Sequence, residues 1–366
     1  MIASVTAVLV GRVAFDLEEQ GVSDSPARRP KIVDVAKAAG VSPTTVSHAL
    51  NRRGQVDPRT RERVIEAARR LGYRPHLGAQ RLRTGSVSHI ALISSMPFSI
   101  AGGPSRLGFF MELASSAAET ALISGYALVL VPPLEVLPSL DDLDIGGAVV
   151  VEPQQDDEVT QRLSDRGVPL VAVGEQPDAR HRVPFVNLHA DYCSSLLLNH
   201  LHDAGARKIA LLVATQRRES SVAAHREYEV FARRLGMAEH LVLVDERDGE
   251  EGARRRMAEL LDRAPDIDGV CAMVDTFATG VVRAIRESGR AVPGDIRVAT
   301  RYDGIRARTC EPPLTAIDLH LPETAAAAVT LLLQVMSGGD APLSVDVPVP
   351  VLVPRASSAA VIRLGR

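Results

Sequence analysis

The sequence lacks the features of disulfide-rich, secreted and membrane proteins. Its three cysteines, Cys193, Cys271 and Cys310, are too few and too widely spaced for a disulfide framework or a zinc site. It has no tryptophan, and aromatic residues make up only 3% of the chain. No apolar run is long enough to span a membrane, and the N-terminus lacks the basic region and cleavage site of a signal peptide. The 366 residues therefore predict a cytoplasmic globular protein of two or three domains.

Positive charge is concentrated near the start of the chain. Residues 28–86 contain fourteen Lys and Arg against four Asp and Glu, a formal charge of +10. The whole chain has a net charge of −3, so the remainder carries −13. A basic module on an acidic body favours a polyanionic partner for the first part, although a solvated charged face explains the charge alone equally well.

Three helices are expected between Ile32 and Leu71. The first ends at Gly40, the second begins after Ser42 as N-cap with Pro43 in its first turn, and the third repeats this pattern at Asp57 and Pro58. The residues expected in the core are Val35, Ala36, Ala39, Val41, Val46 and Leu50, with Val64, Ile65, Ala68 and Leu71 on one face of the third helix.

After residue 87 the pattern changes to short apolar strands that alternate with amphipathic helices. This alternation is typical of parallel sheets in α/β units, and about eight strands predict two sheets with a cleft between them. The predicted divisions are an extension at 1–29, a helical domain at 30–74, a linker at 75–87 and an α/β domain at 88–366. Within the last, we expect one subdomain at 88–184 plus 320–342 and another at 185–319 plus 343–366.

Two short helices joined at Gly40 form the pattern of a helix-turn-helix motif. In that motif, the start of the second helix faces base edges in the major groove of DNA. Thr44, Ser47 and His48 carry groups that donate to or accept from bases and phosphates, and Ser42 caps the helix. The alternative is that these hydroxyls only cap a helix.

The stretches VAKAAGVSPTTVSHALN and VDPRTRERVIEAARRLGYRPHLGAQRLRTG resemble the DNA-binding and hinge segments of the lactose/galactose repressor (LacI/GalR) family. VDTFATGVVRAIRESGRAVPGDIRVATRYDG and PPLTAIDLHLPETAAAAVTLLL are similar to its later signatures. The resemblance implies a transcriptional regulator, most simply a repressor, that binds double-stranded operator DNA. It places at or near the DNA Ser42, Pro43, Thr44, Ser47, His48, Asn51, Gln55, Asp57, Thr60 and Tyr73.

The resemblance also implies a hinge helix over 76–83 that folds on specific DNA, with Ala79 and Leu82 at the minor groove. Leu82 would wedge between base pairs and kink the duplex. Gly78 weakens such a helix, because Gly costs about 1 kcal/mol relative to Ala there. The alternative for Leu82 is an ordinary linker residue.

The α/β body resembles sensors of the periplasmic-binding-protein type, in which a small-molecule effector binds in the cleft. Asp275 and Asp303 follow apolar strands, where ligands of open α/β sheets bind, although Asp275 could instead cap a helix. The expected effector is a sugar or an anionic metabolite, since Arg301 argues against assuming a neutral sugar. Alternatively, Arg301 could pair with one of these two carboxylates. The expected effector-binding residues are Ser95, Arg226, Asp275, Arg301 and Asp303.

No metal, cofactor or catalytic constellation is expected. His200 and His202 are two residues apart on a predicted helix, so they face different sides and read as surface histidines. We expect a homodimer on a pseudo-palindromic operator, since VIRLGR is too short for a tetramerisation helix. The alternatives are an enzyme with a DNA tether, and a regulator that has lost its operator recognition or its effector.

Overall fold

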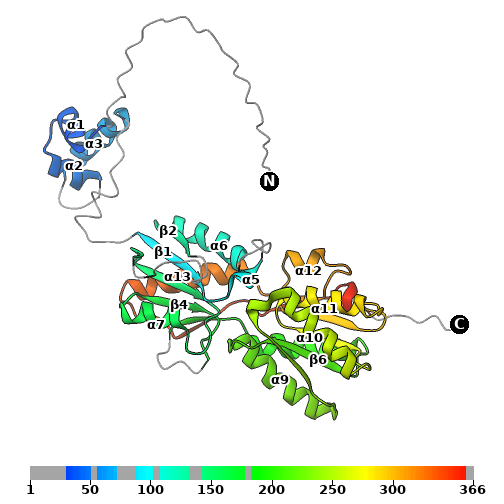
Figure 1. Ribbon diagram of the computed structural model, residues 1–366. Coiled ribbons are helices and arrows are strands. Elements are labelled where there is room, and N and C mark those ends of the chain that lie inside the picture. Colours follow the sequence, from blue (N-terminus) through cyan, green and yellow to red (C-terminus); the bar gives the residue numbers. More distant parts are fainter. Residues whose placement is uncertain are drawn as a thin grey trace, which may run out of the picture. The chain divides into compact units, whose positions relative to one another are not determined.

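The chain divides into two compact units, Met1–Gly85 and Ser86–Arg366. The computed structural model in Figure 1 describes residues 30–50, 56–71, 88–101, 108–131, 140, 142–177 and 183–359. The predicted N-terminal extension and the predicted hinge segment lie outside the described residues. Each unit is built around its own buried apolar residues, so each can be considered separately.

The first unit consists, in its described part, of three helices. These are α1 (Ile32–Ala39), α2 (Pro43–Leu50) and α3 (Pro58–Arg70). Its core contains Val35, Ala36, Ala39, Val46, Ala49, Val64, Ala67 and Ala68. Ile65, which we expected on the inner face of α3, is 44% exposed. The inward positions follow the spacing of three and four residues from Val64, which selects Ala67 and Ala68.

The predicted ends of these helices are confirmed. Gly40 has φ 64°, the left-handed conformation that glycine adopts without a steric penalty, and it ends α1. The Ser42 hydroxyl accepts from the backbone N–H of Thr45 at 3.1 Å at the start of α2. The Asp57 carboxylate accepts from the backbone N–H of Thr60 at 3.0 Å at the start of α3. These bonds satisfy backbone donors that a helix leaves unpaired in its first turn.

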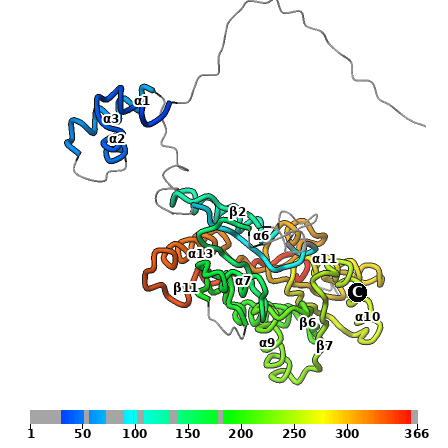
Figure 2. Tube along the Cα trace, turned by 60° about the vertical axis from the view of Figure 1, so that its left-hand side comes forward, coloured from blue at the N-terminus to red at the C-terminus, as the bar shows by residue number. Residues whose placement is uncertain are grey.

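The second unit contains two parallel sheets, which define a first and a second lobe. The first lobe has a six-stranded sheet in the order β11-β5-β4-β3-β1-β2. Its strands are β1 (His89–Ser94), β2 (Ala127–Val131), β3 (Gly147–Val151), β4 (Leu170–Val173), β5 (Phe185–Asn187) and β11 (Ser344–Asp346). Its helices are α5 (Phe98–Ala101), α6 (Phe109–Ile123), α7 (Glu158–Asp165) and α13 (Leu321–Met336), of which α6 and α13 lie side by side (Figures 1 and 2).

The second lobe has a four-stranded sheet in the order β7-β6-β8-β9. The strands are β6 (Ile209–Ala214), β7 (His240–Val244), β8 (Gly269–Ala272) and β9 (Arg297–Thr300), beside an antiparallel pair, β10 (Ala316–Asp318) and β12 (Val351–Val353). The helices are α8 (Ala190–Asp203), α9 (Glu219–Leu235), η3 (Glu246–Asp248), α10 (Gly249–Arg263), α11 (Asp275–Glu287), α12 (Ile305–Thr309) and η4 (Ala356–Ser358). Among the described residues, no helix has the length and apolar character needed to cross a membrane.

The sheet order differs from the predicted subdomain boundaries at two strands. We assigned residues from 185 and from 343 to the second subdomain, yet β5 and β11 pair with each other and complete the first sheet. The chain therefore crosses between the lobes after these strands and not before them.

Two of the crossings share one backbone geometry. His189, between β5 and α8, and His320, between β10 and α13, both have φ 50°. The backbone N–H of His189 donates to the Asn187 side chain at 2.9 Å, and that of His320 donates to Asp318 at 2.9 Å. A short polar side chain two residues earlier thus fixes the bend at each crossing.

Candidate functional site

The first turn of α2 presents an exposed polar surface. Ser42, Pro43, Thr44 and His48 are exposed, and Thr44 and His48 lie one turn apart on the same face. Ser47, which we also expected at this surface, is only 8% exposed. Backbone N–H groups at a helix start and these side chains can bind phosphates or base edges.

The start of α3 holds Thr60, another predicted DNA contact. Its hydroxyl lies 3.3 Å from the Asp57 carboxylate and 3.4 Å from Nη2 of Arg63. Thr60 therefore stabilises the helix start, whatever else it contacts. The other predicted DNA contacts, Asn51, Gln55, Tyr73, Ala79 and Leu82, lie outside the described residues.

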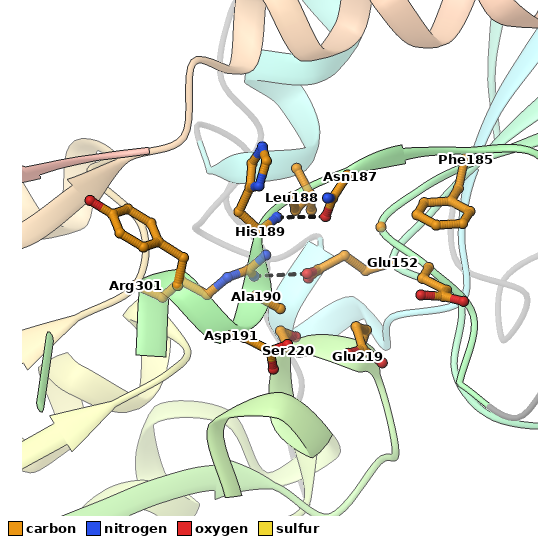
Figure 3. A pocket seen from close by; sticks show the side chains of 13 residues that line it. Glu152, Phe185, Asn187, Leu188, His189, Ala190, Asp191, Glu219, Ser220 and Arg301 are labelled. Atoms are coloured by element: carbon orange, nitrogen blue, oxygen red, sulfur yellow. Dashed lines mark hydrogen bonds and ion pairs between the residues drawn. The ribbon is translucent and has the colours of Figure 1, made fainter. Parts of the chain in front are cut away.

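A pocket of about 290 Å³ lies in the second unit, where side chains of both lobes meet. The carboxyl ends of β3, β4 and β5, the crossing into α8, the start of α9 and the residue after β9 enclose it. Its lining consists of Glu152, Gly174, Glu175, Phe185, Asn187, Leu188, His189, Ala190, Asp191, Tyr192, Glu219, Ser220 and Arg301 (Figure 3). This is the edge where ligands of parallel sheets bind.

Arg301 is the predicted effector residue that lines this pocket. Its Nη1 lies 2.7 Å from Oε1 of Glu152, and the two side chains are 5% and 9% exposed. Figure 3 shows the pair spanning the pocket between the lobes. Its Nε and Nη2 are buried without a hydrogen-bond partner among the residues that the structure describes. The partner is thus Glu152, and not Asp303 or Asp275 as we had considered.

A second buried arginine, Arg218, joins the lobes, and we did not predict it. Its guanidinium makes two bonds to the Glu246 carboxylate at 2.7 and 2.8 Å. It also donates to Ser95, the predicted residue after β1, at 3.0 Å, and to the backbone oxygen of Glu152. Burial alone would lower the pKa of Arg218, but Glu246 outweighs it and the pKa is raised. The sequence could have indicated Arg218 as a cleft residue, because it follows the predicted strand β6 and precedes α9, and residues after strand ends line such clefts.

Asp275 and Asp303 do not line this pocket. Asp275 accepts from the backbone N–H of Thr276 at 2.8 Å, and burial raises its pKa despite the nearby charge of Arg306. Asp303 lies 2.6 Å from Nη1 of Arg355 and 3.3 Å from Nη2 of Arg308. Burial opposes ionisation of Asp303, but these arginines hold its pKa below the ordinary value.

Arg226, the remaining predicted effector residue, does not line the pocket either. Its side chain is 51% exposed and pairs with Asp191, and it lies 3.9 Å from Glu219. Both carboxylates line the pocket, so Arg226 balances part of their charge from outside.

The thiols and histidines do not form a reactive cluster in the described part of the chain. Burial raises the pKa of Cys193 to about 11 and that of Cys271 to about 12, so both stay protonated at neutral pH. His200 is half-buried and its Nε2 lies 2.7 Å from the Ser358 hydroxyl, so it is not the surface histidine we expected. Among the described residues, no three His, Cys, Asp or Glu side chains are grouped to hold a metal.

Comparisons with known proteins agree with both units. Residues 31–76 match the model of bacterial regulatory proteins of the lacI family, and residues 198–358 match a periplasmic binding protein-like domain. The transcriptional regulator CelR of Thermobifida fusca is 31% identical over 309 residues, which is 80% of this chain and 87% of CelR. A structure of the CelR–cellobiose complex superimposes with a TM-score of 0.66 at 26% identity, covering 90% of this chain and 100% of that one. The lac repressor dimer bound to operator and the anti-inducer ONPF gives a TM-score of 0.71 at 23% identity, covering 91% and 100%.

Proposed function

The chain belongs to the lacI family of bacterial regulatory proteins, and from this membership we propose that it is a repressor acting in the cytoplasm. It is a DNA-binding transcriptional regulator whose operator affinity is modulated by a small-molecule effector. The observation that supports the DNA-binding role most directly is the exposed start of α2, where Thr44 and His48 share one face.

In this proposal α2 lies in the major groove. Thr44 and His48 contact base edges, while Ser42 and the first backbone N–H groups of α2 bind a phosphate. Pro43 offers only an apolar contact because it has no N–H. Ser47, Asn51, Gln55, Thr60 and Tyr73 contribute contacts around the helix. Two headpieces of a homodimer reach major-groove faces about one helical turn apart, which requires a pseudo-palindromic operator.

The linker supplies the connection between sensing and binding. Ala79 and Leu82 lie at the minor groove, and Leu82 kinks the duplex by wedging between base pairs. Replacing Leu82 by Ala should lower affinity for the operator much more than affinity for unrelated DNA. An equal loss on both DNAs would contradict the wedge.

The effector binds at the pocket between the lobes. Arg301 offers buried donors there, and Arg218 with Ser95 connects the lobes beside it. Asp275 and Asp303 lie at strand ends of the second lobe, outside the lining of this pocket. By linkage, DNA must change effector affinity by the same factor as the effector changes DNA affinity.

Selection of genomic fragments by the purified full-length protein tests the DNA-binding role. Salt must be fixed near the physiological value, because phosphate contacts dominate affinity. We expect one shared pseudo-palindrome. On that sequence Thr44→Ala and His48→Ala should each cost about 1–3 kcal/mol of binding free energy, as expected for a base contact. Thr330→Ala removes a hydroxyl from an exposed position of α13 in the second unit and serves as the control.

Weak binding to every fragment that disappears steeply with salt would contradict operator recognition. It would leave only an electrostatic interaction between a basic patch and phosphates.

We infer that the α/β unit binds its small molecule without converting it. The relatives are named as transcriptional regulators, and the protonated thiols of Cys193 and Cys271 are poor nucleophiles. Recovery of an unchanged effector after incubation with the protein would support this inference, and turnover would favour an enzyme with a DNA tether.

A further inference from the structure

The charges that line the pocket are mostly negative. Four carboxylates, Glu152, Glu175, Asp191 and Glu219, face one guanidinium, Arg301. The formal charge of the lining is therefore −3. Arg301 alone would favour an anionic ligand. Whether the pocket favours an anion or a cation therefore depends on how the carboxylates are placed around this guanidinium.

The charge of Arg301 is already balanced inside the pocket. Glu152 comes from the opposite lobe and lies 2.7 Å from Nη1. Nevertheless Nε and Nη2 lack an acceptor among the described residues, although Arg301 is only 4% exposed. Both nitrogens are shielded from water in this arrangement, so a ligand oxygen reaches them only after the side chain shifts, and it would then satisfy donors that are costly to leave unpaired. A neutral oxygen of the ligand can act as this acceptor, so the ligand does not need a negative charge.

The other three carboxylates lie around the rest of the pocket. Asp191 and Glu219 share Arg226, which lies outside the lining and is half exposed. Glu175 follows β4 and is exposed. Two like charges a few ångströms apart repel by about 1 kcal/mol even in bulk water, and more in a partly enclosed site. A ligand carboxylate or phosphate would therefore be repelled, whereas an ammonium group would be attracted.

We propose that the effector carries a primary ammonium group together with hydroxyl or carbonyl oxygens, as an amino sugar does. The oxygens accept from the guanidinium of Arg301, and the ammonium group lies against Glu175, Asp191 and Glu219. The proposal rests on the effector role of this pocket and narrows it to one ligand class. A cavity of about 290 Å³ is at the lower end of ligand-site sizes, which suits a molecule no larger than a monosaccharide.

Four probes of similar size separate the contributions of charge and acceptor oxygens. They are D-glucosamine as the cation with hydroxyls, D-glucose as its neutral counterpart, D-glucuronate as the anion, and putrescine as a cation without oxygen. Calorimetric titration of the full-length protein at about pH 6, where an amine is protonated, gives each affinity at one ionic strength. We expect D-glucosamine to bind more tightly than both D-glucose and putrescine, and D-glucuronate to bind most weakly.

A matched pair of variants tests where the charge acts. Glu175→Gln should lower the affinity for D-glucosamine by about fivefold and leave that for D-glucose unchanged, as removal of one attractive charge predicts. Glu259→Gln makes the same chemical change on the exposed face of α10 and should alter neither affinity.

Three results would overturn the proposal. They are tighter binding of D-glucuronate than of D-glucose, equal binding of D-glucosamine and D-glucose, and no binding of any of the four probes. Operator selection with the same preparation separates this failure from failure of the regulatory role. A protein that selects a pseudo-palindrome but fails the probe test keeps its proposed function and loses only the ligand class.

Discussion

Asp275 is a carboxylate in an unfavourable place. It sits in the first turn of α11, where burial raises its pKa and the charge of Arg306 compensates only in part. For a raised pKa, the folded state loses stability as the pH rises above the value of the unfolded chain, about 3.9 for Asp. Such a penalty at the end of a strand is a feature of functional sites, where a charged group is kept at the expense of stability.

Replacing Asp275 by Asn should therefore stabilise the second unit. Asn keeps an oxygen to accept from the Thr276 N–H but cannot ionise. We expect the thermal midpoint to rise by a few degrees at about pH 8 and by less at about pH 4.5, so that the gap from the wild type widens with pH. Differential scanning calorimetry of the full-length protein at several pH values measures this gap.

The exposed Asp262 provides the control, because Asp262→Asn should not change the midpoint at any of these pH values. A midpoint that falls in Asp275→Asn at high pH would show that the carboxylate stabilises the fold.

For individual residues, the sequence predicted contacts with neighbours in the chain but not pairs between residues far apart in the chain. Ser42 and Asp57 cap their helices through bonds three residues away, which the sequence displays directly. The partner of Arg301 is 149 positions earlier in the chain, on the opposite lobe. Asp303 lies at a strand end as expected, but its carboxylate forms an ion pair with Arg355, which follows β12. Pairs of this kind depend on how distant strands, and the two lobes, come together in the fold.

The N-cap of α3 stabilises the start of that helix. Asp57 accepts from both the backbone and the hydroxyl of Thr60. Asp57→Ala should cost about 1 kcal/mol, the usual contribution of an N-cap. Hydrogen exchange of the α3 amides in the full-length protein should accelerate about fivefold, while exchange in α9 stays unchanged. Unaltered exchange in α3 would show that packing of Val64 and Ala67 alone holds this helix.

The contact between α10 and α11 allows a sharper prediction. Gly280 lies in α11, and a Cβ added there would come within 2.2 Å of the backbone oxygen of Glu250 and 2.9 Å of the backbone N of Arg254. Backbone atoms cannot move aside as a flexible side chain can, so the two helices must separate. We expect Gly280→Ala to destabilise the second lobe by several kcal/mol, in the range of severe overpacking, about 3 kcal/mol or more.

Denaturant unfolding followed by circular dichroism measures this change. Arg283→Ala, on the exposed side of the same helix, should cost under about 1 kcal/mol, because its ion pairs are solvent-exposed. Equal stability of Gly280→Ala and the wild type would mean that α10 and α11 can repack at no cost.

The helices and strands themselves follow from the sequence, but their assignment to lobes does not. Apolar periodicity predicted the three helices of the first unit and the parallel strands of the second. It could not assign β5 or β11 to a lobe, because each strand is only three residues long and its residue pattern does not indicate which sheet it joins. Their pairing is decided by the neighbouring strand β4 and by the crossings at His189 and His320.

For the α/β unit as a whole, specific polar contacts join the two lobes in addition to the apolar core that spans them. Arg218 reaches Ser95 and the Glu152 backbone, and Arg301 reaches the Glu152 side chain. The Ser99 hydroxyl donates to the Glu246 backbone oxygen at 2.6 Å, and Tyr302 donates to Glu112. No sequence pattern announced these contacts, since each joins residues far apart in the chain. Because polar contacts of this kind can be exchanged for contacts with water or a ligand, they can bias the lobes between closed and open arrangements.

Arg218→Lys should shift this equilibrium towards an open arrangement. Lysine keeps the positive charge but cannot make the two parallel bonds to Glu246 while also donating to Ser95. Spin labels on Glu119→Cys in α6 and Glu259→Cys in α10, in a Cys310→Ser background, report the distance between the lobes by pulsed electron paramagnetic resonance. Both positions are on helices of different lobes, and Cys193 and Cys271 are buried away from the label.

We expect the doubly labelled parent to give mainly one distance and Arg218→Lys to add a longer one, with an effector restoring the shorter distance. Arg256→Lys makes the same chemical change at an exposed arginine of α10, which pairs with Glu259 in the wild type, and it should not add the longer distance. A single unchanged distance in Arg218→Lys would mean that the remaining contacts between the lobes, among them Arg301–Glu152, Tyr302–Glu112 and Ser99–Glu246, are enough to hold the lobes closed. Effector control would then have to act through those remaining contacts, and Tyr302→Phe in the same labelled background would be the next variant to measure.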